Sequence, residues 1–307
     1  MRMTVVRTGP RVVVKDLGRP GHGALGVAPS GAADRGALTR ANALVGNPGW
    51  SAGLECTLGG LRVVFDFDAV VALTGSDASL LVDGAAHASE RVVEVAAGSV
   101  VQVGMPRRGV RSYLAVRGGI DVAPVLGSRS TDASGLGPAR PAAGDELPIG
   151  APPRRGVGSA DRRPAASPTP ALGGSESSPP EPLSGRSSTG DDHLILEVDL
   201  GPRDDWFTDD AVATFLGETY TVTPASDTVG LRLDGPALTR SRTEELPSEG
   251  VVRGSVQVPP NGLPIIFQAD HPVTGGYPVI AVLTPAAADR AAQLRPGQSV
   301  RFTEAPA

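Results

Sequence analysis

Charged and polar side chains gather in a glycine-rich segment near the start of the chain, Asp16-Leu-Gly-Arg-Pro-Gly-His-Gly23. Its glycines let the backbone come close to a ligand. Arg19 can hold a carboxylate or a phosphate through two parallel hydrogen bonds, and His22 can transfer protons near neutral pH. The same segment also fits a tight turn whose arginine and histidine face solvent. We take Arg19 and His22 as candidate catalytic residues.

A second polar segment, Pro29-Ser-Gly-Ala-Ala-Asp34, precedes a stretch with helical spacing of its apolar residues. Ser30 and Asp34 are candidate substrate-binding residues. A serine in a turn and an aspartate at a helix N-terminus are the plainer alternative, because both residue types favour these positions.

Two further polar residues lie where the pattern predicts burial. Asn42 is inside the expected helix, and because asparagine is a poor helix former we expect a specific hydrogen bond, either structural or to a ligand. Glu55 lies in an apolar, strand-like stretch, where a partly buried carboxylate needs a partner. Arg19 and Arg62 are the expected partners of Glu55. Both Asn42 and Glu55 are candidate substrate-binding residues.

The second half holds the richest polar region, in which Gly254–Gly262 leads through an apolar strand to Gln268-Ala-Asp-His271 and then to Thr274-Gly-Gly-Tyr-Pro278. Adjacent glycines expose backbone N–H groups that can bind an oxyanion. An ordinary β-hairpin is the alternative. We expect catalytic roles for Asp270 and His271, and substrate contacts from Gln257, Thr274, Gly275, Gly276 and Tyr277.

Short strands must position these segments, because 40 glycines and 29 prolines among 307 residues argue against helical bundles and coiled coils. One helix is expected after Asp34, ending at Gly46, and two more over 209–216 (capped by Thr208) and 285–294. Strands are expected at 4–6, 11–15, 61–67, 69–74, 79–82, 92–95, 99–103, 112–116, 194–200, 220–222, 230–233, 254–258, 264–268, 279–283 and 299–303.

Residues 151–193 differ in composition from the rest of the chain. They contain 8 Pro, 8 Ser and 6 Gly among 43 residues and few large apolar ones. Such a segment buries too little surface to offset its ordering entropy, so we expect a flexible, disordered linker. It separates two predicted domains, 1–150 and 194–307.

The net charge of the chain and its rare residue types exclude several classes of protein. The net charge of −5 argues against nucleic acid or an anionic membrane as the main partner. Lys15 is the only lysine, so the chain has no phosphate-binding P-loop, and Lys15 lacks the neighbouring methionine of a biotin-carrier lysine. Cys56 is the only cysteine, which excludes an intrachain disulfide and a cysteine zinc cluster. Without a signal peptide or a long apolar run, a cytoplasmic protein is expected.

The motifs in order resemble one family. They are Asp-x-Gly-Arg-x-Gly at 16–21, Pro-Ser-Gly-Ala-x-Asp at 29–34, Ala-Asn-x-Leu-Val-Gly-Asn-Pro at 41–48, Leu-Glu-x-Thr-Leu at 54–58, Ala-Val-Arg-Gly-Gly-Ile-Asp at 115–121, Leu-Gly-Ser-Arg-Ser-Thr at 126–131, Gly-Ser-Val-Gln-Val-Pro at 254–259 and Thr-Gly-Gly-Tyr-Pro at 274–278. This series is similar to that of the allophanate hydrolase subunit 2 / biotin-dependent carboxyltransferase family, and it covers nearly everything outside the linker.

The resemblance implies a mostly β fold, with two cyclophilin-like β-barrel domains and a few short helices. It also implies an enzyme subunit: the C subunit of an ATP-dependent 5-oxoprolinase, which opens 5-oxoproline to glutamate together with an A-type subunit and a B-type (KipI-like) subunit. ATP is then expected, bound mainly by a partner subunit because this chain has few aromatic residues to stack on a nucleobase. Mg²⁺ is expected with ATP, and no covalent biotin on this chain.

Two alternatives stay open within the same resemblance. One is a component of a biotin-dependent carboxyltransferase, as in urea carboxylase and allophanate hydrolase systems, which needs a separate carrier domain. The other is a non-catalytic, KipA-like regulator that binds a KipI-like kinase inhibitor. Turnover without biotin would exclude the first alternative, and a stable pair without any turnover would favour the two alternatives over the oxoprolinase.

Overall fold

The computed structural model describes residues 1–153, 193–242 and 244–306. The chain forms two compact units. Unit 1 comprises Met1–Ala24 and Pro29–Ser184, and unit 2 comprises Leu25–Ala28 and Gly185–Ala307. Nearly all of the predicted linker, 151–193, lies outside the described residues, so its flexibility stays a prediction.

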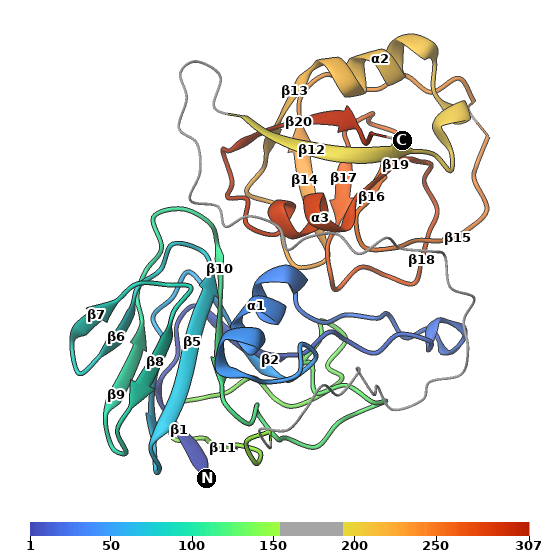
Figure 1. Cartoon of the computed structure of the whole chain (residues 1–307). Coiled ribbons are helices and arrows are strands. Elements are labelled where there is room, and N and C mark those ends of the chain that lie inside the picture. Colours follow the sequence, from blue (N-terminus) through green and yellow to red (C-terminus); the bar gives the residue numbers. More distant parts are fainter. Residues whose placement is uncertain (154–192, 243, 307) are drawn as a thin grey trace. The chain divides into compact units, whose positions relative to one another are not determined.

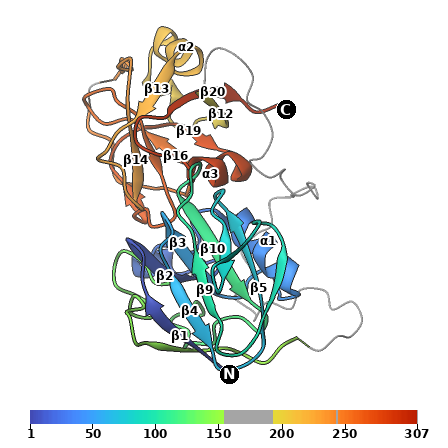
Figure 2. The same cartoon turned by 90° about the vertical axis from the view of Figure 1, so that its left-hand side faces the viewer.

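Unit 1 is built from two antiparallel sheets (Figures 1 and 2). The six-stranded sheet has the order β11 (Glu146–Pro148), β1 (Arg2–Arg7), β4 (Arg62–Phe65), β9 (Val100–Val103), β6 (Leu80–Val82) and β7 (Ala85–His87). The five-stranded sheet has the order β2 (Arg11–Lys15), β3 (Gly53–Thr57), β10 (Arg111–Val116), β5 (Ala69–Gly75) and β8 (Val92–Val95).

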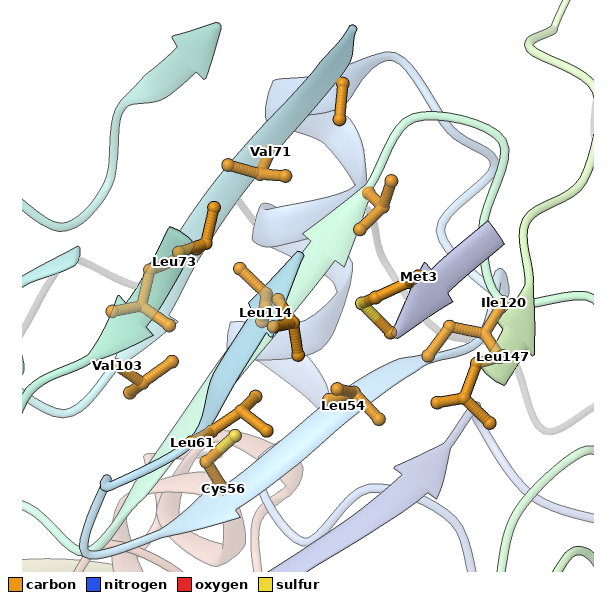
Figure 3. Packing of buried hydrophobic residues seen from close by; sticks show 14 of the residues in the cluster. Met3, Leu54, Cys56, Leu61, Val71, Leu73, Val103, Leu114, Ile120 and Leu147 are labelled. Atoms are coloured by element: carbon orange, nitrogen blue, oxygen red, sulfur yellow. The ribbon is translucent and has the colours of Figure 1, made fainter. Parts of the chain in front are cut away.

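The core of unit 1 takes side chains from both sheets. Met3 and Leu147 from the six-stranded sheet belong to the same buried cluster as Leu54, Cys56 and Leu114 from the five-stranded sheet (Figure 3). The other face of the five-stranded sheet is covered by helix α1 (Arg35–Val45) through a separate apolar cluster. Because this sheet is covered on both faces, all six residues of β10 are buried.

Helix α1 begins and ends as its sequence predicts. The Asp34 carboxylate accepts a hydrogen bond from the Ala37 N–H, which satisfies one of the free donors of the first turn. Gly46 ends the helix in the left-handed conformation, with φ of +77°. A 3₁₀ turn, η1 (Gly23–Leu25), lies upstream.

Unit 2 is a closed barrel (Figure 1). Its strand order is β12 (His193–Leu200), β19 (Val279–Leu283), β16 (Ser255–Gln257), β17 (Ile265–Phe267), β14 (Gly230–Asp234), β13 (Thr219–Val222) and β20 (Ser299–Glu304), and β20 returns to pair with β12 in parallel. A separate two-stranded sheet joins β15 (Glu249–Gly250) to β18 (Thr274–Gly275). Closure pairs both edges of the barrel sheet with each other.

The barrel core is apolar and aromatic, and two helices contribute to it. Phe215 of α2 (Asp209–Gly217) stacks on Phe302 of β20, with ring centroids 4.3 Å apart. Helix α3 (Pro285–Ala291) adds three buried alanines, and η2 (Asp204–Trp206) adds Trp206. Thr208 caps α2 as predicted.

The predicted fold class is confirmed: the described residues contain many strands and three α-helices, all short. Strands β2, β8 and β19 have the predicted bounds. Helix α3 ends three residues earlier than predicted. Strands β7, β11, β15 and β18, which were not predicted, have two or three residues each, and the five-residue β3 was expected only as a strand-like stretch around Glu55. Among the described residues, no helix has the length and apolarity needed to cross a membrane.

A close backbone approach in unit 1 gives a first testable prediction. Gly59 has φ of +70°, and a Cβ there would lie 2.0 Å from the Gly104 carbonyl oxygen. Gly84 has φ of +86° but open space around it. Gly59→Ala and Gly84→Ala share the cost of a left-handed alanine, so Gly59→Ala will lower the unfolding free energy by a further 1–3 kcal/mol or so. Urea unfolding of the two variants measures this difference, and equal midpoints would contradict it.

Candidate functional site

Glu55 of β3 is the centre of a buried polar cluster in unit 1. The strand registers place Val13 and Tyr113 opposite it, and its side chain is 1% exposed. Its Oε2 accepts hydrogen bonds from the Tyr113 hydroxyl at 2.8 Å and from the Ala33 N–H at 3.0 Å. Its Oε1 lies 3.2 Å from Arg11 Nη1. The carboxylate is therefore fully engaged by its own chain.

The partners expected for Glu55 are wrong. Arg11 pairs with it, and Arg111 Nε lies 3.9 Å from its Oε1. Arg62 instead donates to Gln102 at 2.8 Å. Arg19 bonds elsewhere, as described below. Arg11 and Arg111 lie two residues from Val13 and Tyr113, so they share the face of the sheet on which Glu55 lies.

The cluster determines the protonation states of Glu55 and Tyr113. Burial alone would raise the pKa of Glu55, but the positive charges of Lys15, Arg111 and Arg11 outweigh it and lower that pKa below its ordinary value. Burial, reinforced by the negative charge of Glu55, raises the pKa of Tyr113 well above its usual range. Glu55 is thus an anion and Tyr113 a neutral hydrogen-bond donor.

Ser30 and Asp34 lie next to this cluster. The Ser30 hydroxyl is 3.3 Å from Lys15 Nζ, and both side chains are 1% exposed. Ser30 has φ of +51°, a left-handed conformation that is costly for a serine and is often kept at functional sites. Asp34 caps α1, and its own N–H donates to the Tyr113 hydroxyl at 2.8 Å. Unit 1 therefore brings three predicted residues together: Ser30, Asp34 and Glu55.

Asn42 has structural hydrogen-bond partners. Its Nδ2 donates to the Ser51 carbonyl at 2.8 Å and to the Gly49 carbonyl at 3.3 Å, and its Oδ1 accepts from Asn47 at 3.1 Å. The expected specific hydrogen bond is present, and it fastens the loop after α1. Substrate binding by Asn42 stays a prediction without support from this geometry.

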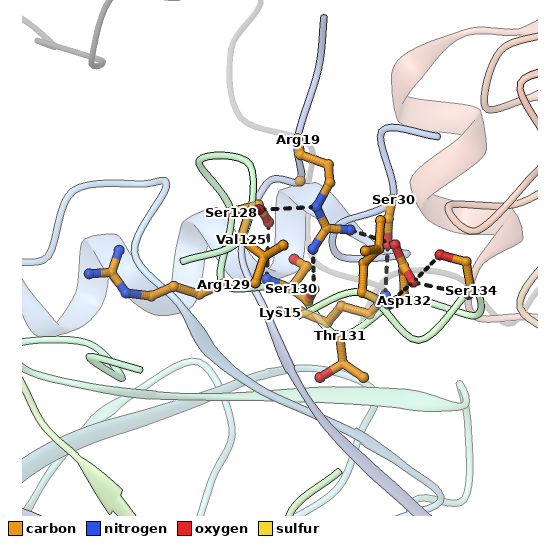
Figure 4. Close-up of polar contacts among 12 residues, drawn as sticks. Lys15, Arg19, Ser30, Val125, Ser128, Arg129, Ser130, Thr131, Asp132 and Ser134 are labelled. Atoms are coloured by element: carbon orange, nitrogen blue, oxygen red, sulfur yellow. Dashed lines mark hydrogen bonds and ion pairs between the residues drawn. The ribbon is translucent and has the colours of Figure 1, made fainter. Parts of the chain in front are cut away.

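Arg19 is enclosed by its own chain (Figure 4). Its side chain has no exposed surface, and all three guanidinium nitrogens have acceptors. Nη1 is 2.6 Å from Asp132 Oδ2, Nη2 donates to the Ser130 carbonyl, and Nε lies 3.4 Å from the Val125 carbonyl. This arrangement favours a structural role over the predicted grip on a ligand.

Asp16, like Arg19, links the glycine-rich segment to residues 125–132. Its carboxylate accepts from the Ser128 hydroxyl at 2.6 Å, the Ser130 hydroxyl at 2.7 Å and the Arg129 N–H at 2.6 Å. Together with Arg19 it fastens the glycine-rich segment to residues 125–132. His22 follows Arg19 in the chain, immediately before η1, and is half-buried.

Gln257 and the Thr274–Tyr277 loop lie next to each other in unit 2. Gln257 of β16 is buried, and its Nε2 donates to the Tyr277 carbonyl at 2.8 Å. Thr274 and Gly275 form β18, and a Cβ on Gly275 would lie 2.4 Å from Gln257 Nε2. Through this hydrogen bond Gln257 supports the Thr274–Tyr277 loop, and the absence of a side chain at Gly275 permits the close contact.

Asp270 and His271 are both buried in a turn after β17. His271 Nδ1 lies 2.6 Å from the Pro272 carbonyl, which leaves Nε2 as the ring atom for other contacts. The His271 ring also lies against Phe267, at a centroid distance of 6.2 Å. Their predicted catalytic roles remain predictions.

A pocket of about 820 Å³ opens in unit 2 beside Gly276 and Tyr277. It is of a size that accepts a small organic ligand. Ala237–Arg240, Arg242, Glu244–Leu246 and Pro260–Gly262 line the rest of its wall, as far as the structure describes them. Sequence reasoning missed Arg240 because it lies in no glycine-rich motif. No group of three or more metal-binding side chains occurs within the described residues.

Residues 25–304 match the family described as carboxyltransferase domain, subdomain A and B. The chain belongs to this carboxyltransferase family. The predicted family resemblance is thereby confirmed. The match takes in most of the residues described above, including Ser30, Asp34, Glu55, Gln257 and the Thr274–Tyr277 loop, and it excludes the segment that carries Arg19.

Named members and relatives fall into two groups. The C subunit of 5-oxoprolinase from Escherichia coli is 36% identical over 306 residues, which cover 98% of this chain and 91% of that protein. The corresponding C subunit from Haemophilus influenzae is 29% identical, covering 95% and 87%. The urea amidolyase of Saccharomyces cerevisiae is 30% identical, over 96% of this chain but 16% of that protein.

Solved structures agree with the family assignment. The urea amidolyase of Kluyveromyces lactis superposes with a TM-score of 0.82 at 28% identity, covering 99% of this chain and 18% of that one. The urea carboxylase of the same yeast gives a TM-score of 0.82 at 28% identity and covers 27% of that chain. The carboxyltransferase chain described here thus corresponds to a small part of those longer proteins.

Proposed function

We propose that this chain is the C subunit of an ATP-dependent 5-oxoprolinase, acting with an A-type subunit and a B-type (KipI-like) subunit to convert 5-oxoproline to glutamate. One observation carries the proposal: the similarity to the C subunit of the E. coli 5-oxoprolinase extends over nearly the full length of both chains. The longer urea amidolyases share only a fraction of their length with this chain.

The chemistry explains why such an enzyme needs ATP. A five-membered lactam is a stable amide whose nitrogen is a poor leaving group. Phosphoryl transfer from ATP to the amide oxygen activates the carbonyl carbon, water then attacks that carbon, and the ring C–N bond breaks as the nitrogen takes up a proton. Glutamate, phosphate and ADP are released. The protein's main contribution to such a reaction is positioning and electrostatic stabilisation.

Roles for this chain's residues follow from exposure and contacts. Gly276, which is exposed, and Tyr277, which is 43% exposed, are proposed to position an oxygen of the substrate. The hydrogen bond from Gln257 to the Tyr277 carbonyl holds their loop in place. His22 or His271 is proposed to assist proton transfer, and Asp270 is next to His271 in sequence. Ser30 and Asp34 are proposed to contact substrate beside the Glu55 cluster.

ATP and Mg²⁺ are proposed to bind mainly on a partner subunit. The described residues offer no acidic cluster for a metal ion, and the sequence has no P-loop. With ATP as a co-substrate, the cytoplasm is the proposed location.

A biotin-dependent carboxyl transfer is the second candidate function. The family description and the urea amidolyase relatives favour it. A separate carrier domain would have to deliver carboxybiotin. The two functions differ in a direct way, because the oxoprolinase needs no biotin.

Release of glutamate and ADP from 5-oxoproline and ATP tests the proposed function. The chain is assayed alone, with its B-type partner, and with both the A-type and B-type subunits. We expect turnover only with the full set, and no change when avidin is added to sequester biotin. A stable complex without turnover would contradict the proposal, and carboxyl transfer from carboxybiotin in the same complex would then support the second candidate.

A further inference from the structure

The pocket of unit 2 contains a positive charge that has no counter-ion among the described residues. Arg240 lies in its wall, half-buried, and within the described residues no carboxylate lies at ion-pair distance from it. Arg242, in the same wall, differs: its guanidinium is 2.8 Å from Asp205 Oδ2 and lies over the Trp206 ring. Arg242 is therefore neutralised by its own unit, and Arg240 is not.

Neutral groups fix the position of the Arg240 guanidinium. Nη2 donates to the Val258 carbonyl, and Cζ lies over the Tyr277 ring at 5.9 Å from its centroid. The buried Nε–H has no acceptor among the described residues. Burial also lowers the pKa of Arg240, although an arginine stays charged at any physiological pH. A partly desolvated cation held in this way gains from an anion placed against it.

The surroundings of Arg240 leave room for that anion. A Cβ built on Gly276 would meet nothing within 4 Å, so the wall is open at this position. Asn261 Oδ1 accepts from the Leu263 N–H at 3.2 Å, which leaves its amide N–H groups as further donors at the rim. Glu244 and Glu245 also line the pocket, but both are exposed, so water and salt screen their charges.

We propose that this pocket binds an oxyanion, the carboxylate of a small organic acid or a phosphate group, on the Arg240 guanidinium beside Tyr277. The inference deepens the proposed function and rests on it for the choice of ligands, because 5-oxoproline carries a carboxylate and ATP carries phosphates. Arg240 is then the residue that selects for a negative charge.

Isothermal titration of the full chain at low salt tests the proposal with three probes. These are 5-oxoproline, 2-pyrrolidinone (the same lactam ring without the carboxylate) and inorganic phosphate. At least one of the two anions will bind, and the one that binds identifies the source of the oxyanion. Arg240→Gln will weaken that binding about 10- to 100-fold, the loss expected for a charge-assisted hydrogen bond. Arg301→Gln, at an exposed position on β20, is the matched control and will bind as the unmodified chain does.

A second variant guards against misfolding of the first. Gly276→Val leaves Arg240 intact and adds a side chain to the open wall, and it will also weaken anion binding. The proposal is overturned if neither anion binds, if 2-pyrrolidinone binds as tightly as 5-oxoproline, or if Arg240→Gln and Gly276→Val both bind like the control. Failure of the proposed function would give a different result: the three-subunit assay would show no turnover, while the chain would still bind the anion.

Discussion

Replacing Glu55 by glutamine will lower the unfolding free energy of unit 1 by about 3–5 kcal/mol, because it removes the anion at the centre of a buried cluster of positive charges. Arg11 and Arg111 would lose the Glu55 carboxylate, and the Tyr113 hydroxyl and the Ala33 N–H would lose a charged acceptor. Urea unfolding measures the change. In a Trp206→Phe background, Trp50 is the only tryptophan and its fluorescence reports unit 1.

The matched control is Glu94→Gln on β8, where the side chain is exposed. Substitution there will change stability by no more than about 0.5 kcal/mol. Equal unfolding midpoints for the two variants would show that the Glu55 charge contributes nothing, and would contradict the cluster described above.

The same residue makes the stability of unit 1 dependent on pH. Because the pKa of Glu55 is lowered in the folded state, its contribution is present above its ordinary pKa of 4.5 and is lost as pH falls through the folded value. The difference between the unmodified chain and Glu55→Gln will therefore be full at neutral pH and will shrink in acid. A difference that is constant from neutral pH down to strong acid would contradict this assignment.

Replacing Arg19 by methionine will also destabilise unit 1 by about 3–5 kcal/mol, since it leaves the Asp132 carboxylate buried without its cation. The Ser130 and Val125 carbonyls lose a donor at the same time. Unfolding followed through Trp50 again gives the measurement. In a double-mutant cycle with Asp132→Asn, the coupling energy isolates the pair itself.

Arg2→Met is the control for Arg19→Met, because the Arg2–Glu146 pair is largely exposed and contributes at most about 1 kcal/mol. Arg19→Met also distinguishes a structural role of Arg19 from a ligand-binding role. A structural arginine changes the unfolding midpoint. A ligand-binding arginine raises KM in the three-subunit assay while stability is unchanged, and that result would restore the role expected from sequence.

Local features of the fold could be predicted from sequence. The helix from Asp34 to Gly46 follows from its cap, its apolar spacing and its terminal glycine. Strand β2 has the predicted bounds because Arg11–Lys15 is a β-branched run between turns. The very short strands escaped prediction because two or three residues hold no periodic pattern.

The partners of polar residues could not be predicted, since they depend on strand register and loop packing. Glu55 pairs with Arg11 because of the registers of β2, β3 and β10, and a shift of one residue would have moved either arginine to the other face. Arg19 is satisfied by residues more than a hundred positions away. Arg240 was missed for a related reason: a cation without a counter-ion is recognised only when its neighbours are known.

The pairing of first and last strands has a consequence for synthesis on the ribosome. In unit 1, β1 pairs with β11, and in unit 2, β12 pairs with β20. Since the N-terminal part emerges first, neither unit can complete its sheet until its last strand has been translated. Until then the strands awaiting their partners present open hydrogen-bonding edges to other nascent chains. Because contacts between strands so far apart in sequence form slowly, these edges stay open for longer than they would in a fold of local contacts.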